Sequence, residues 1–166
     1  TQGVLADQGT SGFDVSHAKI DDIDNVMVSY TLKSDATQAC DIYGNTQNKL
    51  KLKSKIIGYS NCYFIGSNDQ RFVFLVSSLG SWIGRLDDSL SHVEDKIQVI
   101  DASNTFVTNF AFPVETATGF TLAYRGEVVG SSDAFASLVE IDFNLQNIIE
   151  TDISNEIFSV PSPKHY

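Results

Sequence analysis

Hydrophobic and polar residues alternate along most of this chain with a period of two. The segment 25–32 places Val26, Val28 and Tyr30 on one face. Side chains of a β-strand point alternately to the two faces of a sheet, so each such segment predicts a strand. The alternating segments are 25–32, 104–112, 119–124 and 134–143, and the apolar run 71–76 has the length and composition of a strand.

Short clusters of Gly, Ser, Asn and Asp separate these segments, as turns do. Examples are Gly44-Asn45, Gly80-Ser81 and the segment 130–133. The only segment with a weak helical pattern is 87–95, which we expect to be a loop. We therefore predict an all-β, antiparallel fold of about 10–12 short strands.

An approximate repeat runs through the chain. The apolar faces of its three strongest strands start at Val26, Phe72 and Phe120, which are 46 and 48 residues apart. Units of about 47 residues with four strands each are typical of propeller blades. Three units cannot close a propeller, so a two-sheet β-sandwich of the same strands stays open as the alternative.

The length of 166 residues fits one ordinary domain. We expect a single all-β domain over 1–160, with repeat units at about 17–56, 57–103 and 104–153 if the repeat holds. A Pro-containing tail, 161–166, follows. The chain begins at Thr1 without a charged-then-apolar leader, which favours a processed or excised chain.

Composition and charge exclude some functional classes. Hydrophobic residues make up 42% of the chain, as in globular proteins, and no apolar run approaches the roughly 20 residues of a membrane-spanning helix. The formal net charge of −10 opposes binding to phosphate backbones, so we expect no nucleic-acid partner. Charged residues are only 19%, and Ser, Thr and Asn take their place, which favours an extracellular β-rich surface.

Cys40 and Cys62 are the two cysteines of the chain. If the repeat is real, their strands lie in neighbouring positions within reach of a bridge, and we predict a disulfide between them. Two buried thiols are the alternative. A disulfide forms in oxidising compartments and thus favours an extracellular or surface-exposed location, in a secreted or a virion protein.

Asp21, Asp22 and Asp24 form an acidic cluster directly before a predicted strand. Calcium takes six to eight oxygen ligands, so the cluster is a candidate calcium site, although it lacks the Gly and Glu positions of an EF-hand loop. A solvated acidic turn is the alternative. We expect no other cofactor.

Four of the eight lysines follow one another at every second position and alternate with Leu50 and Leu52. We expect all four on one face of a strand and both leucines buried on the other. This lysine stripe is a candidate surface for an anionic or acidic partner, and the alternative is an edge strand whose lysines block edge-to-edge association. The stripe consists of Lys49, Lys51, Lys53 and Lys55.

Trp82 and Arg85 lie in a segment flanked by glycines and are further candidates for ligand binding. Glycan sites often present an aromatic side chain beside polar groups. Packing of Trp82 into the core is the alternative.

Neither the nucleophile elbow Gly-x-Ser-x-Gly nor the metal motif His-Glu-x-x-His occurs in the sequence, and we assign no catalytic residue. We predict a non-catalytic extracellular or surface module that binds a protein or glycan or assembles, as adhesins, lectin-like domains and virion surface proteins do. Self-association or contact with neighbouring domains is expected. The alternative is a polysaccharide hydrolase that uses Asp and Glu as acid and base.

Overall fold

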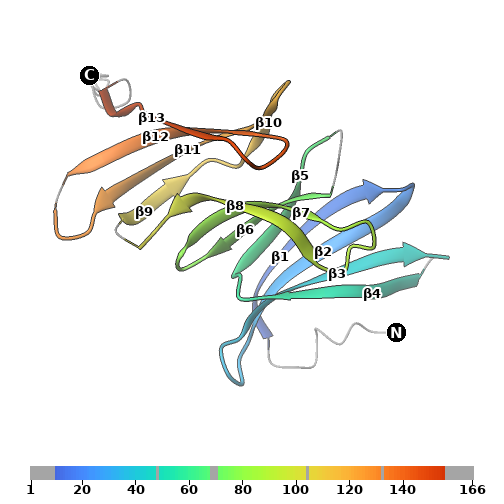
Figure 1. The fold of residues 1–166 in the computed structure, drawn as a ribbon. Helices are drawn as coiled ribbons and strands as arrows, with labels where there is room; N and C mark the ends of the chain where they lie inside the picture. Colours follow the sequence, from blue (N-terminus) through green and yellow to red (C-terminus); the bar gives the residue numbers. More distant parts are fainter. Residues whose placement is uncertain (1–9, 48, 68–70, 104, 132, 156–166) are drawn as a thin grey trace, which may run out of the picture. The chain divides into compact units, whose positions relative to one another are not determined.

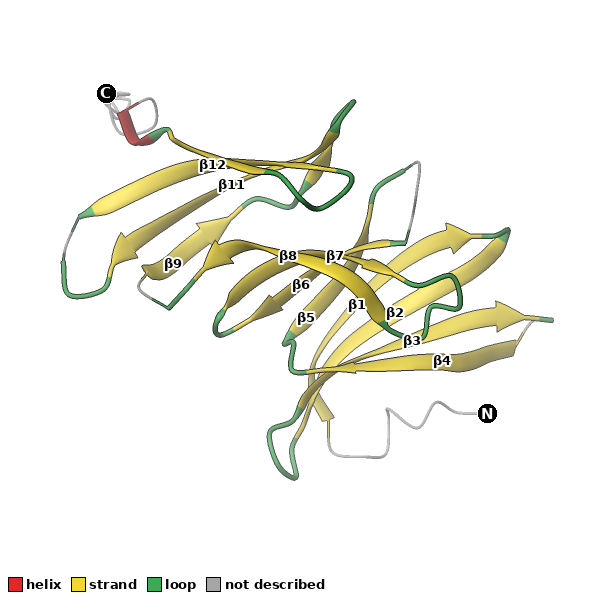
Figure 2. Ribbon diagram, viewed as in Figure 1, coloured by secondary structure: helices red, strands yellow, loops and turns green. Residues whose placement is uncertain are grey.

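A computed structural model of the chain describes residues 10–47, 49–67, 71–103, 105–131 and 133–155. The described part contains thirteen strands in three antiparallel sheets (Figures 1 and 2), which confirms the predicted all-β antiparallel fold with slightly more strands than expected. A propeller is not established by this arrangement.

The first two sheets are four-stranded, and in both the strands neighbour one another in chain order. The first contains β1 (Thr10–Ile20), β2 (Ile23–Leu32), β3 (Gln38–Thr46) and β4 (Lys49–Ile57). The second contains β5 (Asn61–Ile65), β6 (Phe72–Ser77), β7 (Gly80–Leu86) and β8 (Val93–Asp101). The segment 87–92, for which we expected a loop, connects β7 to β8.

The third sheet has the order β10-β11-β12-β13, and β9 also pairs with β11. Its strands are β9 (Thr105–Phe110), β10 (Val114–Glu115), β11 (Gly119–Val128), β12 (Ala134–Asp142) and β13 (Ile148–Asp152). One face carries buried Phe120, Leu122 and Val139, and Phe143 packs edge-on against Phe120 with ring centroids 5.5 Å apart.

The chain divides into two compact units, Thr1–Ile100 and Asp101–Tyr166. The first contains the first two sheets, and the second contains the third. The ends of the expected repeat units lie close to the connections between sheets, but a true repeat and a single domain over 1–160 both stay predictions. The expected tail, 161–166, lies outside the described residues.

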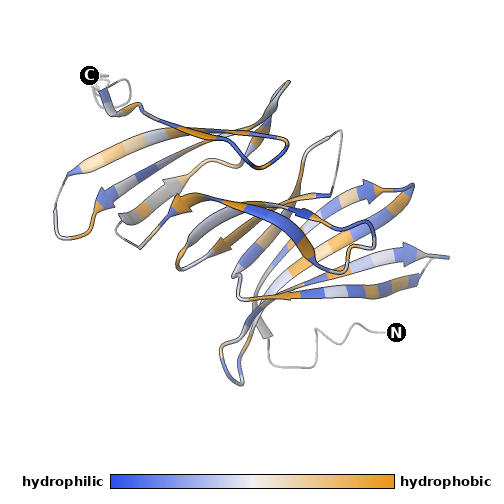
Figure 3. Ribbon diagram, in the orientation of Figure 1, coloured by the Kyte–Doolittle hydropathy of each residue, from blue (hydrophilic) through white to orange (hydrophobic). Residues whose placement is uncertain are grey.

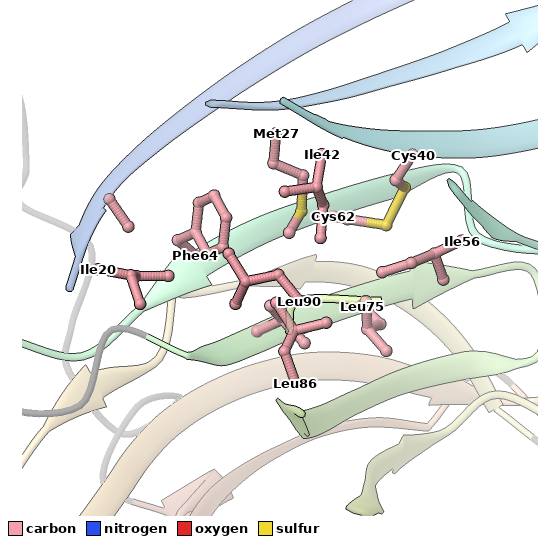
Figure 4. Close-up of a cluster of buried hydrophobic side chains, with 12 residues drawn as sticks. Ile20, Met27, Cys40, Ile42, Ile56, Cys62, Phe64, Leu75, Leu86 and Leu90 are labelled. Atoms are coloured by element: carbon pink, nitrogen blue, oxygen red, sulfur yellow. A yellow bond between two sulfur atoms is a disulfide. The ribbon is translucent and has the colours of Figure 1, made fainter. Parts of the chain in front are cut away.

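The core of the first unit lies between the facing sides of its two sheets (Figure 4). Met27 and Ile42 come from the first sheet, and Leu75 and Leu86 come from the second; all four are almost completely buried. Cys40 of β3 and Cys62 of β5 form a disulfide, with Cα atoms 6.2 Å apart. The predicted disulfide is therefore present, and it joins the two sheets across the core.

Two serines of the first sheet hold the outer edge of β5. A strand at the edge of a sheet leaves backbone N–H groups without a ladder partner. The N–H of Cys62 donates to Ser29 Oγ at 2.8 Å, and the N–H of Phe64 donates to Ser16 Oγ at 2.9 Å. The two facing sheets of the first unit are thus joined along β5 by hydrogen bonds as well as by the disulfide.

Candidate functional site

The more apolar face of β2 points away from the core that contains the disulfide. Met27 and Ser29 face the core and are fully buried, whereas Val26 and Val28 lie on the opposite face and are only partly buried. Alternation along β2 makes this division strict. The face that the sequence pattern marks as apolar is therefore the outer face of the first sheet.

Other apolar side chains of the first sheet lie on that same outer face. The register pairs Val15 with Val28, Leu52 with Tyr43, and Ile57 with Ala39, and directly opposed residues share a face. Val15, Leu50, Leu52 and Ile57 are 60%, 60%, 55% and 63% exposed. We call this surface the outer apolar face, and it consists of Val15, Val26, Val28, Tyr43, Leu50, Leu52 and Ile57.

A buried carboxylate lies in the middle of the outer apolar face. Asp41 is only 5% exposed. The hydroxyls of Tyr30 and Tyr43 donate to its two oxygens, each at 3.1 Å. Lys55 Nζ lies 3.5 Å from Asp41 Oδ1 and donates to the Tyr30 hydroxyl at 2.6 Å. Strands β2, β3 and β4 each contribute to this cluster, so it fixes their side chains to one another.

Two members of this cluster, Tyr43 and Lys55, have pKa values that favour their protonated forms. Burial and the negative charge of Asp41 raise the pKa of Tyr43 to about 12. The hydrogen bond to Tyr30 and the charge of Asp41 raise the pKa of Lys55, although burial opposes this. Tyr43 and Lys55 thus hold their protons, and the cluster acts as a fixed polar centre rather than as a proton donor and acceptor pair.

The lysine stripe is divided by a β-bulge. Ser54 pairs with Ile42 but Leu52 pairs with Tyr43, so Lys53 is the extra residue of β4. Beyond the bulge the faces exchange: Lys55 lies on the outer face beside Asp41, whereas Lys51 is opposite Gly44 on the other face. The Lys53 side chain lies across Gly44, where a Cβ atom would come within 2.3 Å of its Cε.

The expectation that four lysines share one face is therefore wrong, because a bulge shifts the alternation by one residue. The expectation that Leu50 and Leu52 are buried is also wrong, since both lie exposed on the outer face. Figure 3 shows the alternation of hydrophilic and hydrophobic positions along β4. Binding of an acidic partner by these lysines stays a prediction.

Trp82 and Arg85 point to opposite faces of the second sheet. Trp82 is opposite Leu75, packs against the core of the first unit and meets the ring of Tyr59 edge-on, with centroids 5.6 Å apart. Arg85 is opposite Phe72 and lies over its ring, with Cζ 4.7 Å from the centroid. The two side chains are therefore not neighbours in one binding site.

The three carboxylates of the predicted calcium site face three different basic side chains. Asp21 and Asp22 form the turn between β1 and β2, both with positive φ, as a tight two-residue hairpin requires. Asp21 accepts from Arg71 at 3.2 Å, Lys19 Nζ lies 3.5 Å from Asp22, and Asp24 lies 3.3 Å from His17 Nε2. Calcium binding at this turn stays a prediction.

The loop 87–92 is organised around Asp87. Its carboxylate accepts from the hydroxyls of Ser89 and Ser91 at 2.6 and 2.7 Å and from the backbone N–H of Ser91 at 2.6 Å. These hydrogen bonds, with that of Ser89 the largest cause, lower the pKa of Asp87. The residues described in the structure contain no group of three or more His, Cys, Asp or Glu side chains suited to hold a metal ion.

A small pocket of about 180 Å³ lies on the second unit, and its lining includes Glu140 and Asp142. Two carboxylates in one pocket are what the hydrolase alternative needs. Asp142, however, accepts from the backbone N–H of Gln146 at 3.0 Å and from Asn147, which lowers its pKa. Asp142 thus stays ionised and holds the turn between β12 and β13, which does not suit a general acid.

Sequence reasoning missed the residues that make the outer face distinctive. Asp41, Tyr43, Val15 and Ile57 were not candidates, because their neighbours come from other strands and depend on register. Alternation marked parts of this face in two segments: Val26, Val28 and Tyr30 alternate along β2, and Leu50 and Leu52 alternate with lysines along β4.

Comparison of the chain with protein-family models, curated proteins and solved structures gives no match. Within the described ranges, no helix is both long and apolar enough to cross a membrane.

Proposed function

We propose that the chain is a non-catalytic module of an extracellular or surface-exposed protein, and that it binds or assembles through the outer apolar face of β1–β4. One observation carries the proposal: Val15, Leu50, Leu52 and Ile57 are all more than half exposed on one side of one sheet. Single exposed apolar residues are ordinary, but here Val26, Val28 and Tyr43 lie between them on the same face, and an extended apolar face marks a surface that a partner covers.

The polar centre of this face suits recognition of a protein or a glycan. Asp41 and Lys55 form an ion pair that is bounded by two tyrosine rings, and Lys55 Nζ lies 5.3 Å from the centroid of the Tyr30 ring. Interfaces of this kind combine a buried apolar area with a few fixed polar groups. The Cys40–Cys62 disulfide supports an oxidising compartment.

The test replaces two exposed residues of the outer apolar face that lie away from the segment 49–52. The variant Val15→Lys/Ile57→Lys is compared with the control Leu79→Lys/Val129→Lys, whose two positions are as exposed but lie elsewhere. Sedimentation velocity measures self-association, and a panel of polysaccharides in solution measures glycan binding. We expect the outer-face variant to lose about tenfold or more in affinity and the control to bind like wild type.

The same polysaccharide panel discriminates the hydrolase alternative. A binding module releases no new reducing ends, whereas a hydrolase releases them and loses this activity in Glu140→Gln. The proposal is overturned by such turnover. It is equally overturned if the outer-face variant binds like wild type, or if the wild-type chain neither self-associates nor binds a polysaccharide.

A further inference from the structure

Two edge strands of the described chain are exposed and carry opposite charges. Strand β4 ends the first sheet, and its residues from Lys49 to Lys53 are all exposed. Strand β13 ends the third sheet, and all five of its residues, Ile148–Asp152, are exposed. Strand β4 carries lysines at alternate positions, and strand β13 carries Glu150 and Asp152 at alternate positions.

We propose that β4 of one copy pairs with β13 of a second copy as antiparallel neighbours, with Lys51 opposite Glu150. This inference goes beyond the proposed function, because it adds a contact between the strand edges of two copies to the contact that the outer apolar face makes. An exposed edge presents a row of backbone groups to another strand, and charge decides which strands accept it.

The register follows from alternation. With Lys51 opposite Glu150, Lys49 lies opposite Asp152, so both lysines meet carboxylates on one face. On the other face Leu52 lies opposite Ile149, and these side chains are 55% and 61% exposed in the single chain. A parallel arrangement that pairs the same charges does not bring Leu52 to Ile149. The bulge at Lys53 ends the regular segment, so pairing is confined to 49–52.

Two copies of the same edge strand do not pair with each other. Two β4 strands would place lysine against lysine, and two β13 strands would place carboxylate against carboxylate. The contact therefore joins different surfaces of the two copies, and each copy has one basic edge, β4, and one acidic edge, β13. Such a contact continues into a ring or an open chain, or closes as a two-fold dimer in which each copy contributes both edges.

Two other edge strands of the described part, β5 and β8, fit the lysines less well. The outer edge of β5 is already held by Ser16 and Ser29. On β8, Glu94 and Lys96 share one face, so any lysine opposite this strand would meet both signs of charge. The carboxylates of β13 are fixed acceptors: Tyr124 donates to Glu150 at 2.6 Å, and Ser154 N–H donates to Asp152 at 2.8 Å.

Reciprocal charge reversal tests the pairing in the full chain. One variant is Lys49→Glu/Lys51→Glu, and the other is Glu150→Lys/Asp152→Lys. Sedimentation velocity at low salt should show each variant alone associating about tenfold more weakly than wild type or worse. An equimolar mixture should recover association, because the reversed β4 of one then meets the reversed β13 of the other. The control Lys19→Glu/Lys33→Glu makes the same change in net charge at exposed positions away from β4 and should associate like wild type.

Three results overturn the pairing. The first is wild-type association in either reversed variant, and the second is failure of the mixture to recover. The third is stronger association of Lys49→Gln/Lys51→Gln than of wild type, which would show that the lysines block edge contacts. If the wild-type chain is monomeric but binds a polysaccharide through Val15 and Ile57, the pairing fails while the proposed function stands.

Discussion

Ser29 and Cys62 are held together by two hydrogen bonds in the core of the first unit. The N–H of Cys62 donates to Ser29 Oγ at 2.8 Å, and the same hydroxyl donates to the Cys62 carbonyl at 3.3 Å. Ser29 is fully buried and lies on β2, while Cys62 lies on the edge strand β5 and is bonded to Cys40. The hydroxyl therefore serves both the edge of the second sheet and the position of the disulfide.

Replacing Ser29 by alanine should destabilise the first unit. The substitution leaves the N–H and the carbonyl of Cys62 buried without this partner, which costs about 1–3 kcal/mol. Urea unfolding measures the free energy, and Ser34→Ala, at an exposed turn position, is the control that should change little. A loss no larger in Ser29→Ala than in Ser34→Ala would show that the hydroxyl does not support the β5 edge.

Reduction of the disulfide should lower the stability of the wild-type chain. The bond closes a loop across 22 positions, and loops of this size are stabilised by about 3 kcal/mol through restriction of the unfolded chain. Urea unfolding with and without reductant measures the difference. The variant Cys40→Ala/Cys62→Ala should unfold alike in both conditions, and a reductant effect in that variant would assign the loss to something other than this bond.

Tyr43 should make stability depend on pH in the alkaline range. Its pKa is raised from 10.0 to about 12, so the folded state favours the protonated phenol. The sign follows: this contribution is complete below pH 10 and is lost as the pH rises through about 12. The free energy of unfolding should therefore fall over that range.

The variant Tyr43→Phe separates the contribution of Tyr43 to this pH dependence from the contributions of other tyrosines. Tyr124 also has a pKa raised to about 12, by burial and by its hydrogen bond to Glu150, and contributes with the same sign. The fall in stability should therefore be smaller in Tyr43→Phe but not absent. Equal slopes for wild type and variant would mean that the Asp41 cluster does not hold the Tyr43 proton.

Local alternation was sufficient to predict the fold class, but it did not predict which face of each strand meets the core. The pattern of 25–32 correctly indicated a strand, yet Val26 and Val28 turned out to face outward and Met27 inward. A period of two separates the faces of a strand without stating which one meets the core. That assignment is made here by Cys40, Met27 and Ile42, which meet the second sheet.

The lysine stripe shows a second limit of prediction from the alternation within one strand. Alternation in 49–55 predicted one face for four lysines, but the partner strand β3 has one residue fewer between its paired positions. A bulge depends on two strands together and has no signature in one of them. The disulfide was predicted on the assumption that a repeat makes the two strands neighbours. In the structure β3 and β5 belong to different sheets, and the bond forms because both cysteines face the core between them.

Hydrogen exchange at low and high protein concentration tests the central claim, that the exposed strand surfaces of the first unit are covered by a partner in the working assembly. Peptides that span β4 (Lys49–Ile57) and β1 (Thr10–Ile20) report the first sheet, and peptides from β6 (Phe72–Ser77) serve as an internal reference. Association should slow exchange in β4 and leave β6 unchanged. Association that protects other segments while β4 exchanges at the same rate would contradict the account.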